Sequence, residues 1–530
     1  MATATPAPKV SKANATRFLE QATFGPTASD ISRVQSIGFD AYLNEQFSTG
    51  ATGYPGFSYV PHTAPADCKR DPAAPTGPAS LCARDNYTIF QIQRRFFINA
   101  LTAPDQLRQR VAFALSQIFV VSDTEINEAY GMAAYQNMLL KNAFGNFRAL
   151  LTDVTLSPVM GNYLDMVNND KPNPVRGAEP NENYARELLQ LFSIGINKLN
   201  LDGTPQMDSQ GNPVTTYDED VIEGYAHLFT GWTYAPRPGT DSKWTNPIDY
   251  EDVMVSFPSH HDTAAKRILD GKLLPAGQTP EKDLSDGLDA IFYHPNVGPF
   301  ISKQLIQRLV TSNPTPQYVA RVATVFNNNG QGRRGDMRAV IKAILLDAEA
   351  RGDIKTDARY GHLREPAIYM TSILRSLGGQ SDGVYLRSQA STMEQNIFSP
   401  PSVFNYFPPD YEIPETNIVG PEFGILNTST ALNRINFVYR LVYGDGAAAD
   451  ATVTGSTGTK LDLSFLQQYA ADADVLVAHL NQRLMHGTLS AGAHAAIAQA
   501  VNRIAATDST NRVRMAVYLL ATSLQYQVER

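Results

Sequence analysis

The chain has 530 residues, of which 43% are hydrophobic and 18% are charged. This composition supports a large buried core, one to three domains and an ordered chain. The net charge of −8 and the lack of a block of lysines and arginines argue against a nucleic-acid-binding protein. No apolar run reaches the roughly 18 residues that a transmembrane helix requires, so we expect no transmembrane segment.

The first residues and the two cysteines bear on the cellular compartment. Residues 1–8 contain neither the charged nor the apolar region of an export signal, but an Ala/Thr/Pro stretch is also what signal cleavage leaves. Cys68 and Cys82 flank a Pro/Ala/Gly-rich stretch. A disulfide closing a loop of about 15 residues contributes roughly 3 kcal/mol in the chain-entropy model. We expect this disulfide and an oxidising compartment, against the alternative of two free thiols.

Hydrophobic periodicity predicts a mostly α-helical protein. After Pro104, apolar residues from Leu107 to Phe119 form one helical stripe, and Thr27 with Asp30 predicts the start of a helix that Gly38 ends. Similar periodic segments occur near residues 11–23, 84–101, 127–142, 146–157, 181–194, 217–231, 281–293, 296–311, 316–327, 336–349, 361–377, 426–442, 462–485, 488–505 and 508–526.

These segments define the expected fold and domains. We expect a large, irregular multi-helix domain with long loops at 48–84, 164–181, 232–280 and 379–421 and one small β-hairpin at 198–216. The main helical domain would cover 1–443. A Gly/Ala/Thr/Ser-rich linker or exposed loop at 444–460 would lead to a small C-terminal helical subdomain at 461–530.

The first group of candidate site residues lies at 181–189. Asn183, Arg186 and Glu187 follow a long loop and lie beside a strongly apolar stripe, and Tyr184 belongs to the same segment. Partial burial there would shift carboxylate pKa values, as expected of a helix that presents these side chains to a pocket. The alternative is a surface helix that is capped by Asn181 or Asn183 and carries a salt bridge between Glu182 and Arg186.

The second group lies at 216–232. Thr216 and Glu219 fit a capping box, and Glu219, Glu223 and His227 recur every four residues on one helical face. A Glu and a His one turn apart can bind one metal ion or act as a base and its orienting group. The alternative is a helical ion pair. Trp232 extends the apolar face of this segment.

The third group is His260-His261-Asp262, followed by Lys266. His261 and Asp262 could join the second group in a site with three or four ligands, and a metal ion bound by Glu223, His227 and His261 is one expectation. The alternative is structural capping of the loop by the His and Asp side chains.

Other segments carry weaker signals. We interpret His294 as a residue at the start of a helix and Arg364 with Glu365 as a structural ion pair. The aromatic, Pro-rich loop 399–409 could line a groove for a sugar or a peptide, or cover a helix end. Phosphate-binding loops, dinucleotide fingerprints, Gly-x-Ser-x-Gly elbows and His-Glu-x-x-His motifs do not occur, which argues against the corresponding enzyme classes.

Several of these segments together resemble a bacterial family known as domain of unknown function 1800. The resemblance covers roughly residues 11–440 and perhaps 526–529. It rests on these segments: 15–26, 183–189, 220–221 with 229–232, 261–262, 294–295 with 300–303, and 399–403. It implies an exported protein whose partner resembles the alkaline-phosphatase superfamily. Many relatives carry a Trp-His-Asn-His-like run where this chain reads Leu-Ser-Gln-Ile-Phe at 115–119.

These observations lead to one main functional hypothesis and two alternatives. We expect a periplasmic or extracellular hydrolase or lyase that acts on a polymer such as a polysaccharide. Glu187 and Glu223 would be the acid/base pair, with Arg186 and His261 as stabilising groups. Substrate-binding residues would be Asn183, Tyr184, His227, Trp232, Asp262 and Lys266. The alternatives are a non-catalytic cell-surface binding or assembly protein, and a metal-dependent enzyme.

Overall fold

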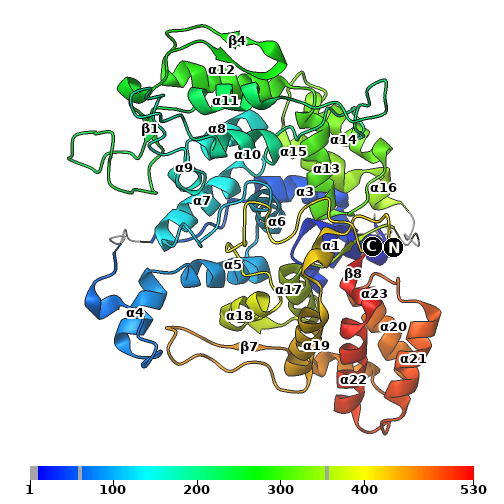
Figure 1. The fold of residues 1–530 in the computed structure, drawn as a ribbon. Coiled ribbons are helices and arrows are strands. Elements are labelled where there is room, and N and C mark those ends of the chain that lie inside the picture. Colours follow the sequence, from blue (N-terminus) through cyan, green and yellow to red (C-terminus); the bar gives the residue numbers. More distant parts are fainter. Residues whose placement is uncertain (1–9, 58–62, 353–356, 358) are drawn as a thin grey trace, which may run out of the picture.

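The computed structural model describes residues 10–57, 63–352, 357 and 359–530. As predicted, the described chain is mostly α-helical, with only small two-stranded sheets. Figure 1 shows α7–α15 and β1–β4 in the upper half of the molecule and α4, α5 and α17–α23 in the lower half. The helices α1, α3 and α6 lie between these halves.

The helices begin and end where local sequence signals place them. As predicted, Thr27 accepts a hydrogen bond from the backbone of the first turn that follows, and Gly38 ends this helix. Ser11 caps the preceding helix in the same way. The first eleven helices are α1 Lys12–Ala22, α2 Ala28–Ile37, α3 Phe39–Ser48, α4 Pro78–Asn86, α5 Phe90–Thr102, α6 Gln106–Ser116, α7 Ala129–Asn142, α8 Phe147–Thr155, α9 Pro158–Tyr163, α10 Asn183–Gln190 and α11 Glu219–Leu228.

Proline often occupies the first helical position in the second half of the chain, where its missing N–H leaves no hydrogen bond unmade. The remaining helices are α12 Pro280–Tyr293, α13 Val297–Leu309, α14 Pro316–Asn327, α15 Met337–Leu346, α16 Ala348–Arg351, α17 Pro366–Leu377, α18 Val384–Thr392, α19 Thr428–Val442, α20 Ala473–Leu484, α21 Ala491–Asn502, α22 Ser509–Thr522 and α23 Leu524–Gln527. Short 3₁₀ turns cover Ala66–Cys68, Pro258–His260, Leu269–Gly271, Pro421–Ile425 and Ser464–Tyr469.

Strands are short and antiparallel, and they join distant parts of the chain as well as neighbours. The four pairs are β1 Trp232–Thr233 with β2 Val255–Ser256, β3 Lys266–Arg267 with β4 Leu273–Leu274, β5 His362–Leu363 with β8 Val528–Glu529, and β6 Gln380–Ser381 with β7 Thr459–Lys460. The predicted hairpin at 198–216 forms isolated bridges, at Leu199 with Pro205 and at Met207 with Pro213, instead of regular strands. Its turn residues reverse the chain, but the intervening side chains are mostly exposed and add little packing.

The segment after residue 443 contacts the preceding helices at several points. β8 pairs with β5, β7 pairs with β6, and α22 packs against α19. Thr459, inside the predicted linker, is buried. The division into 1–443, 444–460 and 461–530 stays a prediction.

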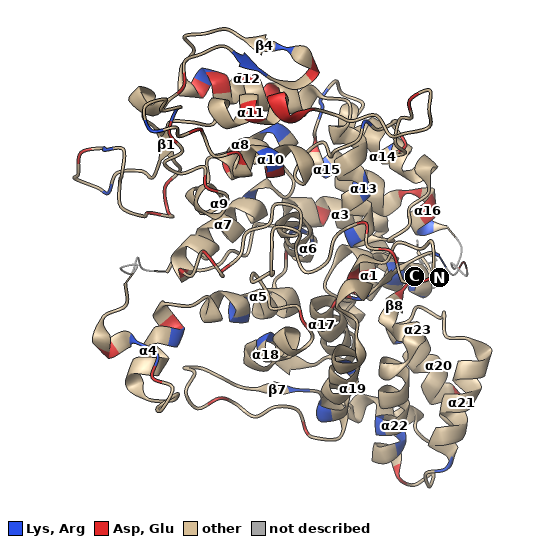
Figure 2. Ribbon diagram, viewed as in Figure 1, with Lys and Arg blue, Asp and Glu red and all other residues tan. Residues whose placement is uncertain are grey.

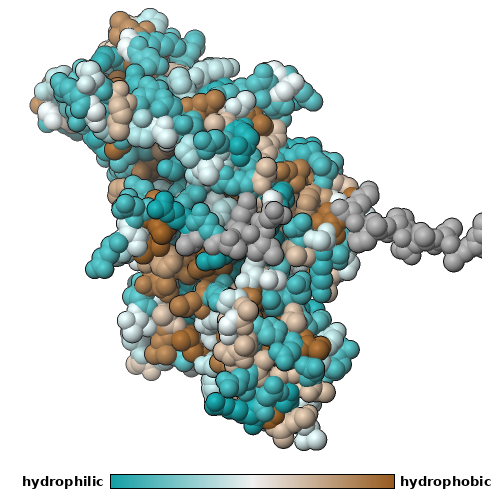
Figure 3. All heavy atoms as spheres, turned by 90° about the vertical axis from the view of Figure 1, so that its right-hand side faces the viewer, coloured by the Kyte–Doolittle hydropathy of each residue, from teal (hydrophilic) through white to brown (hydrophobic). Residues whose placement is uncertain are grey.

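The predicted disulfide is present. Cys68 and Cys82 are bonded, with their Cα atoms 5.0 Å apart. No helix among the described residues combines the length and apolarity needed to span a membrane. Hydrophilic residues predominate on the face in Figure 3, where apolar residues form several separate patches.

Candidate functional site

The first two predicted groups lie on α10 and α11, which pack against each other. Asn181 accepts a hydrogen bond from the amide of Asn183 at the start of α10. The start of α11 corrects a prediction, because the capping side chain is Asp218, which accepts from Val221, and not Thr216. The Thr216 hydroxyl instead lies within the core, near Asn296. Figure 2 shows acidic and basic residues close together on α10, α11 and α12.

Arg186 joins the two helices at the surface. Its guanidinium lies 2.8 Å from Glu182, the residue before α10, and 2.5 Å from Glu219 on α11. The Arg186 side chain is 37% exposed. The ion pair with Glu182 is the one that the surface-helix interpretation predicts, and exposed pairs of this kind stabilise a fold by at most about 1 kcal/mol.

Glu187 is the most unusual carboxyl of the predicted site. It is half-buried, and its Oε2 atom is buried without a hydrogen-bond partner. Burial raises the pKa of this carboxyl, and the charge of Arg186 offsets the rise only in part. Glu187 in turn contributes to the raised pKa of Tyr163 and Tyr217, in addition to the effect of their own burial. A carboxyl whose charged form is disfavoured in this way is suited to a general acid.

His227 and Asp262 come together as predicted. The Nδ1 atom of His227 lies 2.6 Å from Asp262, and its Nε2 atom lies 3.8 Å from Glu223. The Glu223 side chain is 65% exposed. Burial opposes the charged form of Asp262, but hydrogen bonds from the Ala264 amide and from His227 outweigh it and lower the pKa of Asp262. The arrangement is an Asp–His pair at the edge of α11.

His261 turns away from this pair and lies in the interior. Its Nε2 atom is 3.0 Å from Asp283 on α12, and its Nδ1 atom is 2.9 Å from the carbonyl of Thr230. Lys266 lies 2.7 Å from the same Asp283 carboxylate. The side chains of His261 and Asp283 are fully buried, so the loop is held by a closed ionic contact. Asp283 was not among the predicted residues.

The remaining predicted residues have structural surroundings. The Tyr184 hydroxyl is buried 2.7 Å from Thr155, and Trp232 is buried in β1 with its indole N–H unpartnered. Asn183 is half-buried and donates to Asp165. Among the described residues, no three His, Cys, Asp or Glu side chains lie close enough together to hold a metal ion, so the predicted metal ligands do not converge.

A cleft beside α13 was not predicted as the site. It consists of two adjoining cavities of about 270 and 260 Å³, which share Gly195, Ile196, Phe300, Gln304, Pro409 and Asp410. We call it the α13 cleft. One end is lined by Gln117, Ile118, Gln190, Leu191, Arg308, Val403, Phe404 and Pro408, and the other by Ile194, Asn197, Leu199, Gly203, Lys303 and Gln307. The Pro-rich loop 399–409 therefore lines a groove, which was one of its two predicted roles.

The α13 cleft combines polar groups with aromatic rings. Arg308 donates to the side chain and the carbonyl of Gln117, while its Nε atom is buried without a partner. Burial lowers the pKa of Arg308 to about 10, against the opposing effect of nearby carboxylates. The amide nitrogen of Gln304 is also buried and unpartnered. Phe404 is 49% exposed at the opening. Gln117 and Ile118 come from the stretch in which this chain departs from the resembled family.

Comparisons with known proteins give a family and nothing further. No curated protein and no solved structure matches the chain. A sequence model of a family described as proteins of unknown function, domain of unknown function 1800, matches residues 17–528. Since this match spans nearly all 530 residues, the chain belongs to the family known as domain of unknown function 1800.

Proposed function

We propose that the protein is an exported, non-catalytic binding protein that holds an extracellular polysaccharide in the α13 cleft. The observation that carries the proposal is the lining of this cleft by primary amides, one buried guanidinium and aromatic rings. Amides and guanidinium groups donate hydrogen bonds to hydroxyl oxygens, and apolar rings pack against the C–H faces of sugars. The two cavities adjoin, so the cleft offers room for more than one sugar unit along a chain.

The buried groups inside the cleft favour binding of a polar ligand. The unpartnered atoms of Arg308 and Gln304 face the cost of burial without a hydrogen bond. Both atoms are fully covered, so a ligand hydroxyl would remove this cost by accepting from them once their side chains turn toward the cleft. The same cleft is also lined by the apolar residues Val403 and Phe404 and by two prolines, whose rings restrict the backbone.

The disulfide supports the periplasmic or extracellular part of the proposal. Disulfides persist mainly in oxidising compartments and are rare in the reducing cytosol. The exported partner that resembles the alkaline-phosphatase superfamily stays a prediction from the family resemblance, and such a partner is compatible with a cell-surface binding role.

Affinity electrophoresis against a panel of neutral polysaccharides tests the proposal. We expect at least one glucan, xylan or mannan to retard the protein. Phe404→Ala should weaken this binding about tenfold, because burial of one aromatic ring contributes on the order of 1.5–3 kcal/mol. Leu432→Ala is the matched control, since Leu432 is 55% exposed on α19 and does not line the cleft. Absence of retardation by the whole panel, or equal retardation of the Phe404→Ala variant, would refute the proposal.

One observation favours catalysis as a second candidate. The half-buried Glu187, whose Oε2 atom has no hydrogen-bond partner, has the environment of a general acid in a hydrolase or lyase. Its pairing with Glu223, and the roles of Arg186 and His261 as stabilising groups, stay predictions. Release of new reducing ends or unsaturated products from a bound polysaccharide, abolished by Glu187→Gln, would replace the binding role with this one.

A further inference from the structure

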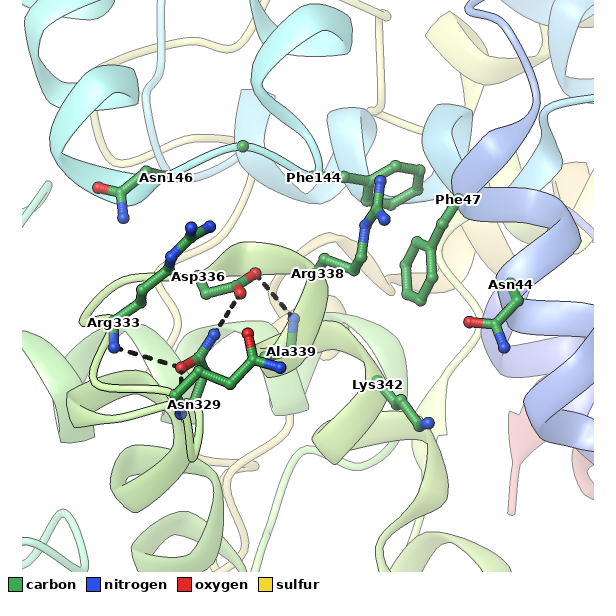
Figure 4. Close-up of a pocket in the computed structure, with 12 residues that line it drawn as sticks. Asn44, Phe47, Phe144, Asn146, Asn329, Arg333, Asp336, Arg338, Ala339 and Lys342 are labelled. Carbon is green, nitrogen blue, oxygen red and sulfur yellow. Dashed lines mark hydrogen bonds between the residues drawn. The ribbon is translucent and has the colours of Figure 1, made fainter.

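Another cavity lies away from the α13 cleft. It has a volume of about 720 Å³, within the roughly 300–1,000 Å³ typical of small-ligand sites. Its walls come from α3, the residues around Phe144, the loop between α14 and α15, and α15 itself (Figure 4). We call it the α15 cavity.

Three basic side chains line the α15 cavity: Arg333, Arg338 and Lys342. Lys342 forms an ion pair with Asp40 at 2.6 Å. Among the described residues, Arg333 and Arg338 form no ion pair with a carboxylate within 4.0 Å. The one carboxylate in the lining, Asp336, already accepts hydrogen bonds from the Ala339 amide and from Asn329 (Figure 4). Two guanidinium groups are therefore available to an anion.

Arg338 packs against an aromatic pair in the wall of the cavity. The rings of Phe47 and Phe144 meet edge to face with centroids 4.9 Å apart. The guanidinium of Arg338 lies 5.3 Å from the centre of the Phe47 ring, and that of Arg108 lies 4.6 Å from the centre of the Phe144 ring. Such cation–π contacts orient a guanidinium while leaving its N–H donors free. Phe47 itself is buried and Phe144 is half-buried, so these rings hold the guanidinium groups in place.

The loop that carries Arg333 is held in place by its own side chains. Asn328 accepts hydrogen bonds from the amides of Gly330 and Gly332, and Asn329 accepts from the amides of Gln331 and Arg333. The backbone at Asn146 bridges to Asp336 and fixes the end of the loop. A side chain that is presented from such a braced loop loses less entropy when it binds a ligand.

The uncharged polar residues of the lining indicate the chemical class of an anionic ligand. Asn44, Asn146, Asn329 and Gln331 place carboxamides around the cavity. Carboxamides offer both donors and acceptors, and a ligand rich in hydroxyl groups can use both. The protein as a whole carries a charge of −8, so non-specific attraction of polyanions is disfavoured and any anion binding depends on this local cluster.

We propose that the α15 cavity binds an acidic saccharide, with its carboxylate or sulfate between Arg333 and Arg338 and its hydroxyl groups against the carboxamides of the lining. This site is separate from the α13 cleft and does not depend on the function proposed there. Bidentate pairing of guanidinium with a carboxylate or sulfate provides the charge-assisted hydrogen bonds, and the carboxamides accommodate the hydroxyls.

Isothermal titration calorimetry with defined oligosaccharides tests the proposal. The ligands are an oligogalacturonate, a sulfated dextran oligomer, a neutral dextran oligomer of the same length, sodium sulfate and an oligoglutamate. We expect one or both acidic saccharides to bind and the neutral one not to bind; the comparison of galacturonate with the sulfated dextran oligomer identifies the anionic group. Equal binding of the neutral oligomer, of sulfate alone or of oligoglutamate, or failure of both acidic saccharides, would overturn the proposal.

Two variants and a matched control locate the binding. Arg338→Gln and Arg333→Gln should each weaken acidic-saccharide binding about tenfold, as expected for loss of one charge-assisted hydrogen-bonding group. Both residues are exposed, so we expect unchanged melting temperatures. Arg503→Gln, an exposed arginine at the end of α21, should bind as the unaltered protein does. Unaltered affinity in both cavity variants, or an equal loss in Arg503→Gln, would contradict the assignment to this cavity.

Discussion

Arg364 donates a hydrogen bond to Glu20 at 3.0 Å, although the two residues lie 344 positions apart in the chain. Both side chains are almost completely buried. The other oxygen of Glu20 lies 2.7 Å from His486, and Arg364 also lies 3.5 Å from Glu529. This buried ion cluster joins α1, the segment before α17, the end of α20 and β8.

Removal of one member of the cluster should be strongly destabilising. Glu20→Ala leaves Arg364 and His486 in the core without their carboxylate, and breaking a buried pair costs about 3–5 kcal/mol. Urea unfolding followed by circular dichroism measures the change in the free energy of unfolding. The control is Glu45→Ala, which breaks an exposed pair with Arg33 and should cost no more than about 1 kcal/mol. A smaller loss in Glu20→Ala than in the control would show that the cluster does not stabilise the fold.

Stability should also fall at alkaline pH because of His362. Burial alone would lower the pKa of His362, but the carboxylates of Glu422 and Glu529 outweigh it and raise the pKa to about 9. A raised folded-state pKa gives stability that is complete below the unfolded value, about 6.5, and is lost as the pH rises through about 9.

Urea unfolding at pH 6, 7.5 and 9.5 checks this pH dependence. His362→Gln should reduce the fall in stability between these pH values, whereas His494→Gln, which affects a more exposed pair with Asp474, should leave it as it is. A profile of the His362→Gln variant that parallels the unaltered protein would show that His362 is not responsible.

The disulfide should contribute measurably to stability. Reduction, or replacement of both Cys68 and Cys82 by Ser, opens a loop with a sequence separation of 14 residues, which is worth roughly 3 kcal/mol in the chain-entropy model. Thermal melts with and without dithiothreitol measure the effect. The doubly substituted protein should melt at one temperature under both conditions. Two thiols that react with a labelling reagent in the unreduced, folded protein would contradict the bond.

Glu187→Gln should stabilise the protein near neutral pH. Because burial raises the pKa of Glu187, its acid form contributes stability at low pH that is lost as the pH rises through the folded-state value. Glutamine keeps a neutral group at every pH, so the variant should melt at a higher temperature at pH 7 and at the same temperature at pH 3.

The control for Glu187 is its neighbour Glu182. Glu182→Gln removes the ion pair with Arg186 and should not raise the melting temperature at pH 7. A lower melting temperature of Glu187→Gln at pH 7 would show that the charged carboxylate has a favourable partner, and it would remove the basis of the acid assignment.

The helices could be predicted because their signals are local. Thr27 with Asp30 and Gly38 mark the ends of a helix that forms at Ala28–Ile37, and the periodic segment near 281–293 forms the helix Pro280–Tyr293. The pairing of β5 with β8 could not be predicted in the same way. Its two-residue strands have no recognisable pattern, and their partners are distant in sequence.

The candidate site could be predicted only in part, for a related reason. His227 and Asp262 form a contact, as expected. His261 precedes Asp262 in an extended segment, so its side chain points the other way and contacts Asp283. In the sequence, Asp283 is an ordinary acidic residue in the first turn of a helix. From the sequence, Gln304 and Arg308 would be expected on the polar side of an amphipathic helix. Both are buried, and the cleft that they line also includes residues of the loop 399–409, which lies elsewhere in the chain.

The buried cluster around Glu20 and Arg364 also sets an order for maturation. Glu529 contributes a carboxylate to it, and β8 supplies the partner strand of β5. Until β8 has joined β5, His362 and Arg364 lack that counter-charge. The central packing is therefore complete only once β8 has joined β5, whatever the helices formed earlier have already achieved.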